Sequence, residues 1–151
     1  MLQPKVVLAP TDFSAPSLDA IETAADVASR FGSVLVLVHA VPALPRLPPS
    51  VSLFKEADYE QSLHDQAVQQ VADLAAKYEK AGVMVKSEVA IANEVGMEIL
   101  RTGDRYGTDL IVIATHGMTG WREFAFGSVA EKVVRLARCA VLVLKVPRAA
   151  G

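Results

Sequence analysis

Five short apolar runs alternate with longer segments of helical periodicity along this chain, and no other feature constrains the fold as strongly. The runs are rich in valine, leucine and isoleucine and occupy residues 5–10, 33–41, 83–91, 110–114 and 140–146. Unbroken apolar runs are typical of parallel strands that are covered on both faces. The alternation therefore predicts an α/β fold, a three-layer α/β/α open sheet of five parallel strands in the order 3-2-1-4-5.

The segments between the runs predict four helices, and the first three stop at a glycine. The first helix follows Ser14, a candidate N-cap. The second, residues 59–81, is the longest and carries a single apolar stripe, and the third spans residues 95–106. The charged Lys86 and Glu88 within the third strand indicate that this strand lies at an edge of the sheet.

A proline-rich segment, residues 42–58, interrupts the pattern before the longest helix. Its prolines at positions 42, 45, 48 and 49 lack the backbone N–H that a regular helix or a central strand needs. We expect a surface excursion whose apolar side chains pack on the domain or on a partner. Because the elements otherwise alternate without a break, residues 1–151 are expected to form a single domain.

The stretch from Leu110 to Val134 predicts a strand, a glycine-bearing loop at residues 115–127 and a helix that opens at Ser128. Ser128 and Glu131 match an S-x-x-E capping box. A loop that leads from the carboxyl end of a strand to a helix N-terminus favours anions, because unpaired N–H groups and the helix dipole both attract negative charge. We therefore expect this loop to hold the phosphates of a nucleotide.

The turn after the first strand is expected beside this loop. In open sheets of this order, ligands bind beyond the carboxyl ends of the strands, at the switch point between the first strand and the fourth. Pro10, Thr11 and Asp12 lie at that end of the first strand. Asp12 has two interpretations, contact with a ligand or a cap on the following turn. His39, at the end of the second strand, is expected to be a hydrogen-bonded core histidine.

Composition and missing motifs exclude several other classes. The net charge of −2 gives no electrostatic case for nucleic acid or an anionic membrane surface. No apolar run approaches the roughly 20 residues of a membrane span. The single cysteine, Cys139, cannot form an intrachain disulfide, so a cytoplasmic protein is expected. No P-loop, dinucleotide fingerprint or nucleophile elbow is present, and the three histidines lack a metal-ligand spacing with Cys139.

Three stretches resemble the universal stress protein family, and together they cover essentially the full chain. The first is KVVLAPTDFSAPS at residues 5–17, which resembles the opening strand and the P-T-D-F-S turn of the family. The second is His39-Ala40-Val41, at the end of the second strand. The third and most specific is ATHGMTGWREFAFGSVAEKV at residues 114–133, which resembles the G-x-x-G, nine residues, G-S/T motif of the ATP-binding members.

Two positions depart from the family pattern. Ala114 stands where the motif has its first glycine, whereas Gly117 fills the second and Gly127-Ser128 close the motif. Ala92-Asn93-Glu94 stands where the family often has a Gly-Asp turn after the third strand. Members that bind no ATP lose the motif far more thoroughly, so the resemblance favours ATP binding.

The resemblance implies a fold like that of the adenine nucleotide alpha hydrolases, with ATP bound together with Mg²⁺ or Mn²⁺. It also implies a homodimer with the strand at residues 140–146 in the interface. It assigns no catalytic residue and no metal ligand, and any ATPase activity would be slow. The nucleotide contacts that it implies are Pro10, Thr11, Asp12, Ala40, Ala114, His116, Gly117, Met118, Gly127, Ser128 and Val129.

Three functions follow as alternatives. The first is a dimeric ATP-binding regulatory module that acts in stress through nucleotide-dependent shape or choice of partner. The second is a structural stress protein with a vestigial nucleotide site, whose dimer or proline-rich segment binds partners. Ala114 and the apolar residues at 44–54 motivate it. The third is a small enzyme related to adenylate-forming enzymes or pyrophosphatases, which has the least support because no S-G-G-x-D-S loop or H-I-G-H segment is visible.

Overall fold

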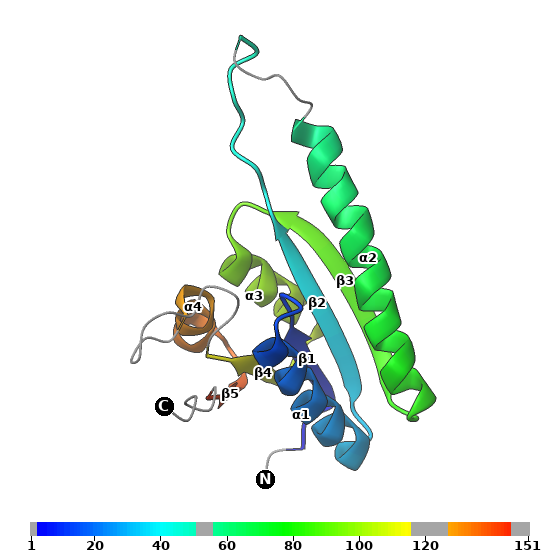
Figure 1. The fold of residues 1–151 in the computed structure, drawn as a ribbon. Helices are drawn as coiled ribbons and strands as arrows, with labels where there is room; N and C mark the ends of the chain where they lie inside the picture. Colours follow the sequence, from blue (N-terminus) through cyan, green and yellow to red (C-terminus); the bar gives the residue numbers. More distant parts are fainter. Residues whose placement is uncertain (1–2, 51–55, 116–126, 146–151) are drawn as a thin grey trace, which may run out of the picture.

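A parallel sheet of five strands, in the order β3-β2-β1-β4-β5, organises the computed structural model, which describes residues 3–50, 56–115 and 127–145 (Figure 1). All neighbouring strands run parallel. The predicted fold class and strand order are therefore confirmed, and β3 lies at an edge as its charges indicated. The strands are β1 (Val6–Pro10), β2 (Val34–Pro42), β3 (Met84–Ala92), β4 (Leu110–Ala114) and β5 (Ala140–Leu144).

Helices cover both faces of the sheet, and glycines end three of them. They are α1 (Ala15–Phe31), α2 (Glu56–Lys80), α3 (Val95–Tyr106) and α4 (Ser128–Leu136). Gly32 and Gly107 adopt the left-handed conformation, with φ of 65° and 61°, and donate their N–H groups back to the last turns of α1 and α3. Glycine reaches this conformation without a steric penalty, which explains why the helices stop where the sequence predicted.

Alternate residues of the central strands point into two separate cores. Val7 of β1 packs with α1 and α2 on one face, whereas Leu8 packs with α3 and α4 on the other. The central strands are thus buried on both sides, as their unbroken apolar runs predicted. Among the described residues, no helix combines the length and the apolar character that a membrane span requires.

At the amino edge of the sheet, a carboxylate joins β1 to β4. Asp109 Oδ2 accepts hydrogen bonds from the N–H groups of Lys5, at 2.8 Å, and Val6, at 3.0 Å. The Asp109 N–H donates in turn to the Val6 carbonyl at 3.0 Å. These bonds fix how far the two strands are staggered, and so which residues lie level at the opposite edge.

The connection between β2 and α2 is shorter than the predicted excursion. β2 continues through Pro42, which lies level with Ala92 on β3, and α2 begins at Glu56 rather than at Tyr59. Proline is tolerated at the end of a strand, where the lost donor matters least. Acidic residues such as Glu56 and Asp58 suit the first turn of a helix because of its dipole.

A buried carboxylate anchors residues 43–50, which extend beyond the end of the sheet (Figure 1). Glu60 on α2 is only 4% exposed. Its Oε1 accepts the Leu44 N–H at 2.7 Å, and its Oε2 lies 3.4 Å from Arg46 Nη2. Because burying an unpaired carboxylate is costly, these contacts hold the root of the connection against α2. The remaining residues of the predicted excursion, 51–55, lie outside the described part of the chain.

Replacing Glu60 by alanine is expected to release this connection. The change leaves the Leu44 N–H without its partner, at a cost of about 1–2 kcal/mol. The open state should become about tenfold more populated, and trypsin should cleave after Arg46 correspondingly faster. Time courses of digestion measure the rate. Glu79→Ala, on the exposed face of the same helix, is the control, and equal rates for both variants would refute the anchoring role.

Candidate functional site

The candidate site lies at the carboxyl edge of β1 and β4, the central pair at which the order of the sheet reverses. Val7 is level with Leu110, and Leu8 with Ile111. Continuing this register places Thr11 level with Ala114. The two predicted turns, distant in sequence, therefore leave the sheet side by side at the switch point, as expected for a ligand site in an open sheet.

A continuous chain of hydrogen bonds orders the turn after β1. The Phe13 N–H donates to Thr11 Oγ1 at 2.9 Å, and the Ser17 hydroxyl donates to the Ser14 carbonyl at 2.9 Å. Thr11 Oγ1 and Ser17 Oγ are 2.9 Å apart. Because the Ser17 proton is already used, the Thr11 hydroxyl must donate to Ser17 Oγ. Each member of this buried chain thus has a partner.

Phe13 adopts an unusual backbone conformation within this turn. Its φ is 63°, in the left-handed region that side chains other than glycine seldom occupy. The ring lies against His39, with 4.6 Å between the ring centroids. His39 Nδ1 lies 2.7 Å from the Thr11 carbonyl, which can only accept, so Nδ1 carries the proton. The predicted hydrogen-bonded role of His39 is confirmed, and its bond joins the end of β2 to the β1 turn.

The Asp12 carboxylate orders the start of α1. Its Oδ1 accepts the Ser14 N–H at 3.0 Å and the Ser14 hydroxyl. Ser14 itself is the N-cap of α1 and accepts the Ser17 N–H at 3.4 Å. The capping interpretation of Asp12 therefore holds in this structure.

The start of α4 is held directly on the end of β4. The Gly127 N–H donates to the Thr115 carbonyl at 2.6 Å, and the Thr115 N–H donates to the Leu144 carbonyl of β5 at 2.9 Å. A Cβ at Gly127 would lie 2.8 Å from the Thr115 oxygen, closer than real Cβ atoms come. This close approach between two backbone segments requires glycine.

The predicted capping box at Ser128 is wrong by one position. Gly127 is the N-cap residue, its carbonyl accepts the Glu131 N–H at 2.9 Å, and Ser128 is the first helical residue. Gly127 has no side chain to cap with, so no side-chain cap bond forms. The N-cap lies one residue earlier than predicted because the close contact with Thr115 places it at Gly127. The first turn of α4 thus begins without the side-chain acceptor that most helices have.

The predicted ligand residues divide into three groups. Pro10, Thr11, Asp12, Ala40 and Ala114 lie at the carboxyl ends of β1, β2 and β4. Ser128 and Val129 lie in the first turn of α4, where N–H groups have no partner within the helix, whereas the Gly127 N–H is engaged by Thr115. His116, Gly117 and Met118 lie outside the described residues.

Metal and thiol chemistry find little support in the described part of the chain. Residues 3–50, 56–115 and 127–145 contain no group of three His, Cys, Asp or Glu side chains placed to hold a metal ion. Burial raises the pKa of the Cys139 thiol, with nearby Asp109 and Asp104 adding to the rise. The thiol is therefore protonated at neutral pH and a poor nucleophile.

A sheet of this order, with a helix N-terminus set on the end of β4 at the switch point, defines the class of α/β nucleotide-binding folds. The sequence profile described as the universal stress protein family matches residues 4–145. The chain therefore belongs to the universal stress protein family. It is 31% identical over 147 residues to universal stress protein MJ0531 of Methanocaldococcus jannaschii. The aligned region covers 95% of this chain and 84% of the relative.

Solved structures share the fold. MJ0577 matches with a TM-score of 0.85 at 23% identity, over 98% of this chain and 100% of its own. A universal stress protein in complex with cAMP matches with a TM-score of 0.62 at 20% identity, over 95% and 98%. The universal stress protein from Archaeoglobus fulgidus in complex with dAMP matches with a TM-score of 0.61 at 19% identity, over 95% and 98%. At these identities the likeness establishes the fold.

Proposed function

We propose that this protein binds ATP together with Mg²⁺ or Mn²⁺ at the switch point between β1 and β4 and acts as a nucleotide-dependent regulatory module in stress. The main support for nucleotide binding is the junction at Gly127, where the N-terminus of α4, which has no side-chain cap, contacts the residue that follows β4. Phosphates are well suited to such a position, since N–H groups and the helix dipole both favour anions.

Family membership and relatives support an adenine nucleotide in particular. Two relatives with this fold are bound to cAMP and to dAMP, and both ligands carry adenine and a phosphate. In the proposed arrangement, adenine lies near Asp12 and the Ala40 backbone, and the phosphates lie near the Ser128 and Val129 N–H groups. Ala114 and the loop residues His116, Gly117 and Met118 complete the proposed path of ribose and phosphates.

The divalent cation would be held chiefly by the phosphates and water. Mg²⁺ usually binds in this way, through substrate phosphates and one or two carboxylates. The described residues hold no cluster of metal-ligating side chains. We assign no catalytic residue, and any hydrolysis would be slow because no arginine finger or water-positioning base is identified among the described residues.

We further propose that the protein is a single-domain cytoplasmic homodimer joined through β5. β5 lies at an edge of the sheet, and edge strands offer unpaired N–H and C=O groups to a second chain. Its Leu142 is 38% exposed, which adds apolar surface to that edge. The lone Cys139 suits a reducing compartment.

A structural stress protein with a vestigial site is the second candidate. Two observations favour it: the Gly127 N–H is already engaged, and Ala114 replaces the first glycine of the motif. This candidate acts through dimer and partner contacts, and the affinity for nucleotide distinguishes it from the first.

Calorimetric titration of the purified protein with Mg-ATP tests the proposal. We expect one site per chain with a dissociation constant near 1 μM, equivalent to about −8 kcal/mol. GTP should bind at least about tenfold more weakly, because its base presents different hydrogen-bonding groups to the Ala40 backbone. Protein denatured after purification should also release adenine nucleotide. If titration shows no heat and denaturation releases no nucleotide, the proposed ATP binding is refuted.

A further inference from the structure

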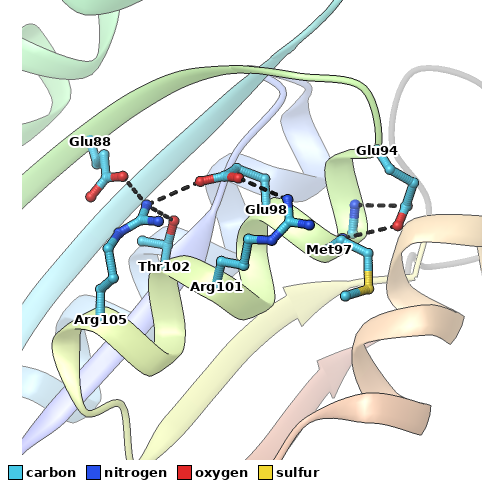
Figure 2. A network of polar contacts seen from close by, with 8 residues as sticks. Glu88, Glu94, Met97, Glu98, Arg101, Thr102 and Arg105 are labelled. Carbon is cyan, nitrogen blue, oxygen red and sulfur yellow. Dashed lines mark hydrogen bonds and ion pairs between the residues drawn. The ribbon is translucent and has the colours of Figure 1, made fainter.

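Glu94 caps the helix that follows β3 and lies where the family often has a Gly-Asp turn. It is the N-cap of α3, with Oε1 accepting the Gly96 N–H at 3.2 Å and Oε2 accepting the Met97 N–H at 3.2 Å. Figure 2 shows this carboxylate above the first turn of α3, with the bond to Met97 drawn. The start of α3 therefore carries a carboxylate, here on the longer side chain of a glutamate rather than of an aspartate.

The same carboxylate reaches α4, the helix whose N-cap is Gly127. Lys132 Nζ of α4 lies 3.0 Å from Glu94 Oε2. A Cβ built on Gly96 would lie 3.1 Å from Lys132 Cδ and 3.4 Å from its Cβ, so the lysine stem lies directly on the first turn of α3. The hydrogen bond from Lys132 also lowers the pKa of Glu94, which keeps the carboxylate ionised.

α3 is itself tied to the sheet by further ion pairs. Arg105 contacts Glu88 of β3, and it pairs with Glu98 of α3 at 3.0 Å (Figure 2). It also donates to Thr102 Oγ1 at 2.9 Å. α3 thus has charged contacts with β3 through Arg105 and, separately, with α4 through Glu94 at its N-terminus. Lys132 lies one helical turn beyond Ser128, so the contact with α4 is close to the first turn of that helix.

We propose that Glu94 and Lys132 are positioning residues for the phosphate end of the nucleotide site. Their pair holds α4 at a fixed position against α3, and so holds the Gly127 junction and the Ser128 and Val129 N–H groups in the geometry that phosphate requires. This inference rests on the proposed function. Lys132 acts through the placement of α4, because its charge is balanced by Glu94.

Three variants and one matched control test this role. Lys132→Met and Glu94→Gln each remove the pair, Lys132→Arg keeps it, and Lys77→Met removes the 3.4 Å pair with Glu22 far from the site. Calorimetry should give about fivefold weaker ATP binding for the first two variants and values within about twofold of wild type for Lys132→Arg and Lys77→Met. Adenosine affinity should not change, because the base end of the site is untouched.

The double variant and a ligand-free measurement complete the test. Glu94→Gln with Lys132→Met should bind ATP no more weakly than either single variant, since both remove one interaction. Exchange of the Gly127 amide proton, measured by NMR without ligand, should be faster in both single variants than in Lys77→Met. This second readout reports on the pair even if the wild-type protein binds no ATP, an outcome that would refute the proposed function.

Distinct results would overturn the proposal. Tighter ATP binding by Glu94→Gln, with weaker binding by Lys132→Met, would show that Lys132 contacts phosphate directly. Equal losses of ATP and adenosine affinity would show a general structural role. Unchanged ATP affinity together with unchanged Gly127 exchange would show that the pair does not position α4.

Discussion

Gly127→Ala is expected to weaken ATP binding by roughly 100-fold, the largest effect of any single substitution in the described site. The added Cβ would lie 2.8 Å from the Thr115 carbonyl oxygen. This oxygen belongs to backbone fixed by the hydrogen bond between the Thr115 N–H and Leu144, so it cannot move aside as a flexible side chain would. The start of α4 must shift instead, and its N–H groups move away from the phosphates.

A second glycine provides the control for this substitution. A Cβ on Gly103, inside α3, would meet its nearest neighbours, atoms of Thr108, at 3.9 Å, an ordinary contact distance. Gly103→Ala should therefore leave ATP binding unchanged and stabilise the helix by up to about 1 kcal/mol. Calorimetry and thermal unfolding of both variants measure the effects. Wild-type affinity in Gly127→Ala would show that the junction does not shape the site.

Thr11→Val should have the second largest effect and act on stability as well as binding. Valine has nearly the same shape as threonine but cannot accept the Phe13 N–H or donate to Ser17. Thr11 is 6% exposed, so water does not replace these bonds easily. Leaving the buried groups unpaired should cost about 2 kcal/mol, which lowers Tm by roughly 4–8 °C in a chain of this size.

Thr11→Ser separates the contribution of the hydroxyl from that of the methyl group, because serine keeps the first and lacks the second. Serine keeps both hydrogen bonds, so this variant should retain most of the ATP affinity, whereas Thr11→Val should lose about tenfold as the Phe13 turn relaxes from its left-handed conformation. Differential scanning calorimetry and titration with Mg-ATP give the two readouts. If both variants unfold at the wild-type temperature, the hydroxyl chain does not stabilise the turn.

The sequence predicted the fold because its signals are local. Unbroken apolar runs marked the buried strands, and Gly32 and Gly107 marked helix ends, since each signal depends on only a few neighbouring residues. The capping box at Ser128 misled because a contact with a distant residue, Thr115, decides where α4 begins. Pro42 was excluded from β2 because proline weakens strands in general, although the end of a strand tolerates it.

The site was predictable in location and less so in detail. Parallel topology alone brings the β1 and β4 turns together, so Thr11 and Ala114 could be assigned to one edge. The left-handed Phe13 and the pair between Glu94 and Lys132 could not, because they depend on tertiary packing. No sequence signal indicated the pair, because the Gly-Asp turn of the family pattern also places a carboxylate near the start of this helix.

An NMR titration with Mg-ATP tests the central claim, that two distant turns form one nucleotide site. Backbone amide signals of uniformly ¹⁵N-labelled protein report each residue separately. We expect signals from Thr11 to Phe13 and from Ser128 to Val129 to shift together, with one common dissociation constant, while those of Lys77 and Glu79 on α2 stay in place. Shifts confined to one turn, or absent from both, would contradict it.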